Sequence, residues 1–181
     1  EDAAAAYRRA LEIRPDFVEA RIGLARVQGE AGQLQEALSS LDIAVRDAPQ
    51  HLLARVNRGI ALIALNRVEE GSAELSRAAR DNPGTVLPLV RLGETLSARK
   101  AYREAADAFA QAVAREPANG ALIHRAGLEY TRAGQASAAE AAFRKAVELA
   151  PDFFTAHLDL GVLLAQQGRF AVAIPEFENA L

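Results

Sequence analysis

Prolines return at a fixed interval of 34 residues, and this constrains the chain more than any other feature. The series is Pro15, Pro49, Pro83, Pro117 and Pro151. Proline lacks the N–H group that a helix interior uses, so a proline just past a helix ends that helix at little cost. A fixed interval of this length is typical of a protein that is built from stacked supersecondary units.

Small and large side chains recur in the same register as the prolines. One row of small residues is Ala10, Ala44, Ala78, Ala112, Ala146 and Ala180. A second is Ala3, Ala37, Gly71, Ala105, Ala139 and Ala173, and a third is Ala25, Gly59, Gly93, Gly127 and Gly161. The row of large residues is Tyr7, Leu41, Leu75, Phe109, Phe143 and Phe177. Small residues let two helices cross closely, and the large row fills the space between neighbouring units. One unit cannot bury its apolar face alone, so stacking supplies the core.

Each period contains two segments with the apolar spacing of a helix, residues 87–99 and 102–116 in the third period. The turn between them carries Gly32, Asn66, Lys100, Gly134 and Gly168 in successive periods. Gly or Asn at this point fits a left-handed residue at a helix C-terminus. No stretch alternates with a period of two. The sequence therefore predicts an all-α chain, an α-solenoid of stacked antiparallel helical hairpins.

This pattern resembles the tetratricopeptide repeat over the whole chain. Residues 86–119 match it through Leu92, Gly93, Ala105, Phe109, Ala112 and Pro117. Residues 120–153 match through Gly127, Tyr130, Ala139, Phe143, Ala146 and Pro151. Where the family often has Trp in the first helix, this chain has Arg21, Arg55, Leu89, Ile123 and His157. The resemblance implies a right-handed superhelix.

The repeat divides the chain as a single array over residues 1–181. The full repeats are expected at 18–51, 52–85, 86–119 and 120–153. Residues 1–17 form half of a preceding repeat, and 154–181 form an incomplete one. Gly71 lies inside a second helix, where glycine costs about 0.5–1 kcal/mol relative to alanine. Pro175 falls near the start of the last helix and is expected to delay or kink it. The chain has no Met, and we interpret it as a fragment of a longer protein.

The resemblance also implies a binding site, a concave groove lined by the first helices that takes a peptide or a partner's helix. The candidate groove residues are Arg26, Leu53, Val56, Asn57, Ile60, Leu87, Val90, Arg91, Glu94, His124, Arg125, Leu128 and Asp159. Among them Arg26, Asn57, Arg91 and Arg125 would form a line of hydrogen-bond donors for a carboxylate or a peptide backbone. Leu53, Val56, Ile60, Leu87 and Val90 would form an apolar patch. The alternatives are that the first set is ordinary solvated surface and that the second packs inside the stack.

Other chemistry finds little support in the sequence. The chain has no cysteine, and its three histidines lack the spacing of a metal site. No nucleophile motif or phosphate-binding loop is present, so we expect a non-catalytic protein without cofactor or metal. The net charge of −3 and a pI near 5.7 argue against nucleic acid, including an RNA-binding array of similar hairpins, whose groove is normally basic. No apolar run reaches the ~18 residues that span a bilayer. We expect a soluble chain, cytoplasmic or periplasmic.

The predicted function is that of a protein–protein interaction scaffold that binds a peptide or a partner helix in its groove. The alternative is a recruiting or assembly arm of a larger multidomain enzyme, or of a bacterial secretion or polysaccharide-export machine. No polar capping helix closes either end of the repeat pattern, so self-association through the uncapped ends is expected as well.

Overall fold

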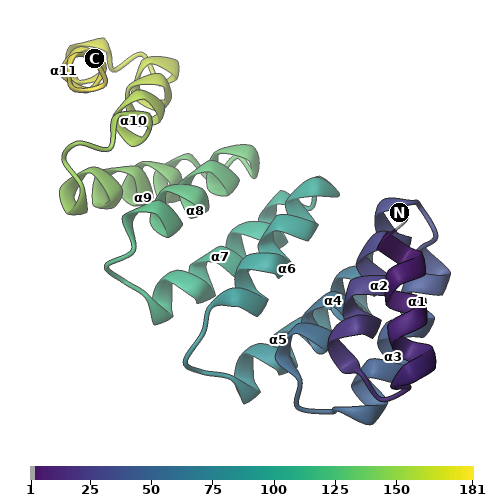
Figure 1. The fold of residues 1–181 in the computed structure, drawn as a ribbon. Coiled ribbons are helices and arrows are strands. Elements are labelled where there is room, and N and C mark those ends of the chain that lie inside the picture. Colours follow the sequence, from purple (N-terminus) through teal and green to yellow (C-terminus); the bar gives the residue numbers. More distant parts are fainter. Residues whose placement is uncertain (1–2) are drawn as a thin grey trace. The chain divides into compact units, whose positions relative to one another are not determined.

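The structure is a computed structural model that describes residues 3–181, and these residues fold into helices with no strand among them. The chain divides into two compact units, Glu1–Thr95 and Leu96–Leu181. Each of the four expected full repeats contains two helices, as does 154–181, whereas 1–17 contains one (Figure 1). The all-α prediction is confirmed. Within residues 3–181 no helix combines the length and the apolar character that crossing a bilayer requires.

The first unit is built from two helical hairpins and the helices beside them. Its helices are α1 (Ala3–Ile13), α2 (Val18–Glu30), α3 (Leu34–Asp47), α4 (Leu52–Ala64), α5 (Val68–Asp81) and most of α6 (Leu87–Ala98). α2 pairs with α3 and α4 pairs with α5, while α1 packs on α2 and α3 packs on α4. The boundary between the units falls inside α6.

The second unit repeats this plan. Its helices are α7 (Tyr102–Arg115), α8 (Gly120–Arg132), α9 (Ala136–Leu149), α10 (Phe154–Gln166) and α11 (Phe170–Asn179). α8 pairs with α9 and α10 pairs with α11, and α7 packs on α8 as α9 packs on α10. Pro175 lies inside α11, which already begins at Phe170, so the expected delay of this helix was wrong.

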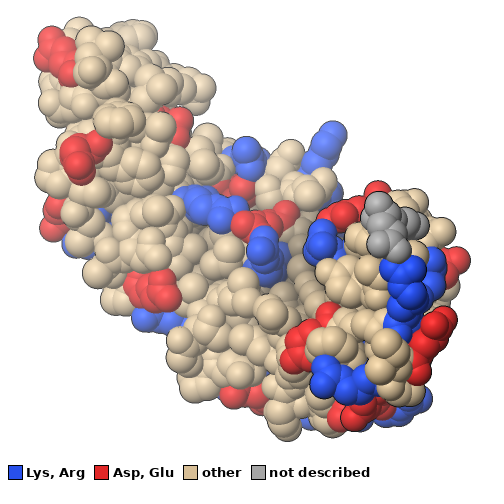
Figure 2. All heavy atoms as spheres, viewed as in Figure 1, with Lys and Arg blue, Asp and Glu red and all other residues tan. Residues whose placement is uncertain are grey.

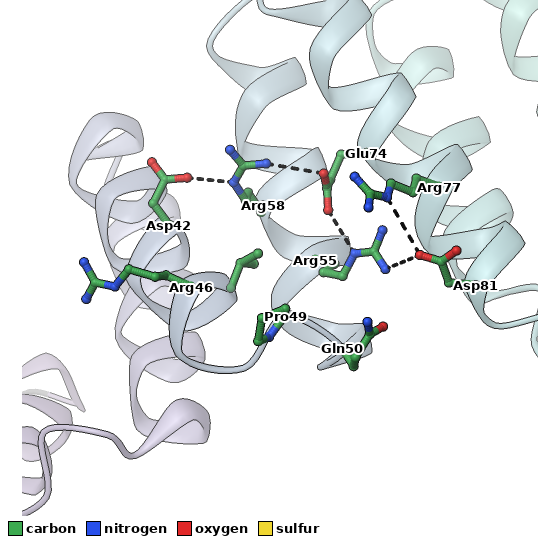
Figure 3. Close-up of a pocket in the computed structure, with 10 residues that line it drawn as sticks. Asp42, Arg46, Pro49, Gln50, Arg55, Arg58, Glu74, Arg77 and Asp81 are labelled. Atoms are coloured by element: carbon green, nitrogen blue, oxygen red, sulfur yellow. Dashed lines mark hydrogen bonds and ion pairs between the residues drawn. The ribbon is translucent and has the colours of Figure 1, made fainter.

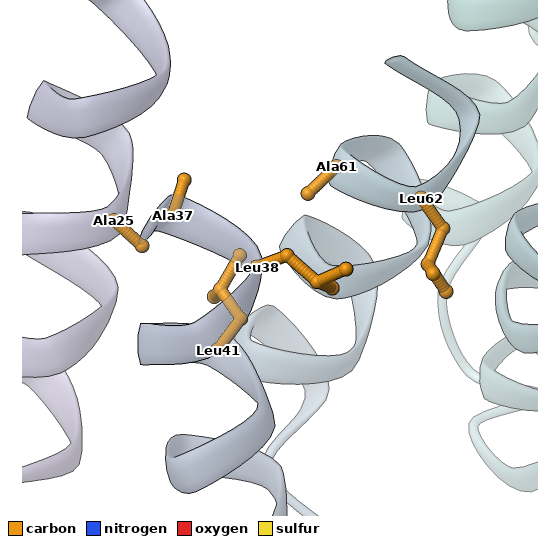
Figure 4. Close-up of a cluster of buried hydrophobic side chains, with 6 residues drawn as sticks. All are labelled: Ala25, Ala37, Leu38, Leu41, Ala61 and Leu62. Atoms are coloured by element: carbon orange, nitrogen blue, oxygen red, sulfur yellow. The ribbon is translucent and has the colours of Figure 1, made fainter. Parts of the chain in front are cut away.

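Each core is shared between successive hairpins, as the repeat pattern predicts. Figure 4 shows a cluster to which α2 contributes Ala25, α3 contributes Leu38 and Leu41, and α4 contributes Ala61 and Leu62. In the second unit, Phe143 of α9 lies in a cluster with residues of both α10 and α11. The recurring large residues Leu41, Leu75, Phe109 and Phe143 are at most 2% exposed. Removing one hairpin would therefore uncover the core of its neighbour.

The turns inside the hairpins use the left-handed backbone at every expected position. The φ angles are 78° at Gly32, 66° at Asn66, 63° at Lys100, 72° at Gly134 and 74° at Gly168. At Lys100 the geometry imposes this conformation on a residue with a Cβ, because Ala101 N–H must still reach the carbonyl of Leu96 at 3.0 Å. The turn geometry thus outweighs the local preference of the lysine.

One glycine has a different role from the one that the sequence indicates. A Cβ added at Gly71 of α5 would lie 2.5 Å from the carbonyl oxygen of Gly59 and 2.5 Å from Cγ1 of Ile63. The backbones of α4 and α5 therefore cross too closely for alanine. The expectation that Gly71 is a costly residue at this place considered helix propensity alone, and packing reverses the preference.

Candidate functional site

A pocket of about 350 Å³ opens between the first helices α2 and α4 of the first unit. We call it the first-helix pocket. Its lining residues are Ala25, Arg26, Gly29, Glu30, Leu34, Ala37, Leu41, Asn57, Ile60, Ala61 and Ala64. Most of this lining is small or apolar, so the pocket suits an apolar side chain with a few polar groups beside it.

Three of the predicted groove residues line this pocket, namely Arg26, Asn57 and Ile60. The Arg26 guanidinium donates to Glu30 over 2.7 Å. This hydrogen bond and a second one to Tyr7 raise the pKa of Arg26 above its usual value. Asn57 and Ile60 are half-buried, and within residues 3–181 no hydrogen bond restrains the Asn57 amide. The pocket therefore offers an apolar wall, a cation and an amide.

The other candidates of the first unit lie outside the pocket. Leu53 is 48% exposed on α4, whereas Val56 is only 2% exposed and packs in the core. Val56 was a wrong choice for a groove residue, because no ligand can reach a side chain that the stack covers. On α6, Leu87 and Val90 are half-buried, and Arg91 donates to Glu94 over 2.8 Å.

In the second unit each predicted groove residue contacts another side chain, although Arg125 remains exposed. His124 is 9% exposed, and its Nε2 lies 2.6 Å from Oδ2 of Asp159. Its ring is 4.9 Å from that of Phe153. Arg125 lies over the ring of Phe109 at 5.0 Å, a cation–π distance. Leu128 packs against the cluster around Phe143. The prediction that His124 is an accessible groove residue was therefore also wrong, because the side chain is buried in the stack.

A group of charged side chains lies on the other side of the first unit, and none of them is among the predicted groove residues. Between the second helices α3 and α5, with α4 as the floor, a hollow of about 380 Å³ is lined by charged residues. We call it the charged hollow (Figure 3). Arg55 contacts Glu74 at 3.0 Å and Asp81 at 2.7 Å, and Arg58 contacts Asp42 at 2.6 Å and Glu74 at 3.4 Å.

Arg55 is the most buried member of this network, because its side chain is only 5% exposed. Burial by itself lowers the pKa of Arg55, but the hydrogen bonds to Asp81 and Glu74 outweigh burial and raise it. The same contact with Arg55 lowers the pKa of Asp81. A buried guanidinium needs such partners, since an isolated buried charge is strongly destabilising. The network thus pairs both floor residues, Arg55 and Arg58, with carboxylates.

The ion pair of Arg55 follows a rule of the repeat. Arg55 holds the position where the family often has Trp, and its partner Glu74 stands 19 residues later. His157 holds the same position in the last repeat, and its Nδ1 lies 2.7 Å from Glu176, again 19 residues later. Where the floor residue is apolar, as at Ile123, the later residue is alanine, here Ala142. This spacing was the signal in the sequence that could have revealed the pairs.

Arg21 is the exception to the rule. It occupies the same position in the first repeat, but Ser40 stands where its glutamate would be. Arg21 donates to the carbonyl of Pro15 and lies 3.9 Å from Asp47. Its Nε is buried and has no hydrogen-bond acceptor within the described residues. The first hairpin thus contains an unsatisfied donor that the second hairpin does not.

Charge is unevenly distributed over the surface. Figure 2 shows acidic and basic side chains interspersed over α1–α3, whereas the visible surface over α9–α11 is mostly uncharged. In that last part of the chain the large apolar residues that are more than 40% exposed are Phe154, Leu158, Val162, Phe170, Val172, Ile174 and Leu181.

Comparison with known proteins shows which family and which solved structures this chain resembles. A tetratricopeptide repeat model matches residues 22–86 and 124–181, and a second one matches residues 1–42. Comparison with curated proteins gives no match. Among solved structures, MamA 41-end from Desulfovibrio magneticus RS-1 is 23% identical, with a TM-score of 0.64 over 99% of this chain and 94% of that one.

Two further structures are similar in fold. Another MamA structure is 17% identical, with a TM-score of 0.68 over 91% of this chain and 90% of that one. YrrB, described as a TPR protein with an unusual peptide-binding site, is 19% identical, with a TM-score of 0.64 over 98% and 91%. Because the family models together match most of the sequence, the chain belongs to the tetratricopeptide repeat family of protein-interaction modules.

Proposed function

We propose that this chain is a non-catalytic scaffold that binds a short segment of a partner protein in the first-helix pocket. One apolar side chain of the segment occupies the space beside Ile60. The Asn57 amide bonds to the backbone of the segment, and Arg26 meets a carboxylate. This narrows the expected groove to the part of it that is both accessible and hollow.

The observation that carries the proposal is the pocket of about 350 Å³ with apolar walls and an unrestrained amide at Asn57. A polar group that is already satisfied gains little from a ligand, whereas Asn57 gains hydrogen bonds when a backbone arrives. Arg26 is 59% exposed and its pair with Glu30 is also exposed, so a ligand carboxylate competes with it at low cost. Assembly in a larger machine, the alternative function, would use the same pocket.

The test starts from a library of randomised 12-residue peptides displayed on phage and selected on the intact chain. Affinities of the selected peptides are measured by fluorescence anisotropy. Ile60→Glu places a charge on the apolar wall and is expected to weaken binding at least tenfold. Asn57→Ala removes the amide and is expected to weaken it by about three- to tenfold, the value of one or two hydrogen bonds.

Ile13→Glu is the matched control, because Ile13 is 86% exposed on α1 and does not line the pocket. It should leave affinity within twofold of the original. Peptides that bind Ile60→Glu and Asn57→Ala as tightly as the unaltered chain would show that this pocket is not the binding site.

A further inference from the structure

A second hollow, of about 470 Å³, lies in the second unit between the second helices α7 and α9, with α8 as its floor. We call it the apolar hollow. Ile123 and Ala126 form the floor and are 4% and 3% exposed. Val113 and Ala142 contribute to the walls, and Lys145 lies at the edge.

The apolar hollow is the repeat counterpart of the charged hollow, two periods later in the sequence. Val113 and Pro117 correspond to Val45 and Pro49, so the frame is the same. The charged groups are replaced one by one: Ile123 stands for Arg55, Ala126 for Arg58, Ala142 for Glu74 and Ala110 for Asp42. Alanine and isoleucine fill less of the frame than two arginines and their carboxylates.

This substitution changes what the hollow can bind. In the charged hollow, Arg55 and Glu74 pair with each other and leave few polar groups for a ligand. The apolar hollow has no such pair, and its apolar walls stay uncovered. A concave apolar surface of this size is the common form of a binding site. Lys145, which replaces Arg77, is the one charged residue among those that line it in the described chain. An occupant must therefore supply apolar volume and, beside it, negative charge.

Lys145 is available for such a charge. Its Nζ lies 3.0 Å from Glu148, one turn further along α9, and the two side chains are 49% and 70% exposed. An exposed pair of this kind contributes little to stability. A carboxylate that enters the edge of the hollow is closer to an apolar environment, where its attraction to Lys145 is stronger.

We propose that the apolar hollow is a second docking site, which takes an aromatic or branched aliphatic side chain of a partner protein with an acidic residue a few positions away in the same segment. It lies between second helices, whereas the first-helix pocket lies between first helices of the other unit. The scaffold would then have one docking site between first helices and one between second helices, and the two sites would bind peptides of different sequence.

The chain itself supplies the variant that tests this proposal. Ile123→Arg with Ala142→Glu rebuilds the pair of Arg55 and Glu74 in the apolar hollow and so removes its apolar character. A second variant, Ala141→Glu, places a negative charge on an exposed position of α9 that lines the hollow. This variant does not alter the buried floor, so it remains informative if the double variant fails to fold.

Peptides are selected from the randomised 12-residue phage library on the intact chain that carries Ile60→Glu, which disables the first-helix pocket. We expect enrichment of sequences with an aromatic, Leu or Ile residue near Asp or Glu. Their affinity should fall at least tenfold with Ile123→Arg/Ala142→Glu and at least fivefold with Ala141→Glu. Lys145→Ala should remove the preference for the acidic residue, and Ile13→Glu should change nothing.

Two outcomes would overturn this proposal without affecting the proposed function of the first-helix pocket. In the first, no peptide is enriched on the Ile60→Glu chain. In the second, the enriched peptides bind the double variant and Ala141→Glu as tightly as the Ile60→Glu chain. Enrichment of basic sequences would contradict the role of Lys145.

Discussion

Replacing Gly71 with alanine should destabilise the protein, although alanine is the better helix former. Gly71 lies inside α5, and in the other hairpins its position in the repeat is held by Ala37, Ala105, Ala139 and Ala173. An argument from the sequence alone would therefore predict a gain. The crossing of α4 and α5 differs because both of its close residues, Gly59 and Gly71, are glycines.

The size of the effect follows from the distances at this crossing. The new Cβ would lie 2.5 Å from the carbonyl oxygen of Gly59 and 3.0 Å from the backbone nitrogen of Ile63, whereas ordinary contact begins at 3.4 Å. Two backbones cannot move apart by rotating a side chain. Overpacking of this kind costs about 1–3 kcal/mol, and the gain in helix propensity returns about 0.5–1 kcal/mol. We expect a net loss of about 1–2 kcal/mol.

Urea denaturation followed by circular dichroism measures this loss, and a thermal melt should show a decrease of about 2–8 °C in a chain of this size. Gly29→Ala is the matched control. Gly29 also lies inside a helix, α2, but nothing comes within 4 Å of its added Cβ. It should gain about 0.5–1 kcal/mol. If Gly71→Ala were neutral or stabilising, the close crossing of α4 and α5 would be refuted.

Four further changes test other features. Ser40→Glu should stabilise the chain by about 1 kcal/mol in urea denaturation by giving Arg21 Nε its missing acceptor, whereas the adjacent exposed Ser39→Glu should not. Lys100→Gly relieves a left-handed residue and should gain about 1 kcal/mol in a thermal melt, while Arg99→Gly should lose stability. Asp81→Asn should destabilise at pH 7. Arg55 lowers the pKa of Asp81 in the folded state. The difference in free energy of unfolding between the unaltered chain and Asp81→Asn should therefore shrink as the pH falls below about 3.9. A difference in urea midpoints that stays constant with pH would contradict the pairing. We also expect self-association through the exposed apolar surface of α11. Replacing both Phe170 and Ile174 with Glu should then reduce the sedimentation coefficient in sedimentation velocity, unlike Gln167→Glu, which removes no apolar surface.

The sequence predicts the fold well because its signals are periodic and repeated. The prolines end the helices, with α3 ending at Asp47 just before Pro49. The large row places Phe109 and Phe143 in the core, and the turn row gives left-handed residues even at Lys100. Each rule is tested several times in one chain, so an irregular residue such as Lys100 does not change the result.

The candidate site was harder to predict, because its accessibility depends on which neighbour covers each residue. Val56 and Asn57 are adjacent in sequence and both were expected in the groove, but Val56 is only 2% exposed, whereas Asn57 lines the pocket. His124 was expected to be accessible and instead bonds to Asp159 between two aromatic rings. The network of Arg55 was missed because charged residues on a helix are usually solvated, and only packing places them inside.

The charged hollow also affects which hairpins can stack as neighbours. Hairpins so similar in shape could stack on the wrong neighbour during folding. The pair of Arg55 and Glu74 lies within one hairpin and is kept whatever the neighbour, whereas Arg58 of α4 contacts Asp42 of α3 in the preceding hairpin at 2.6 Å. If α8 stacked on α3 in place of α4, Ala126 would stand where Arg58 stands and Asp42 would lose this contact. The contact between Arg58 and Asp42 therefore favours the correct order among hairpins that the small and large rows leave interchangeable.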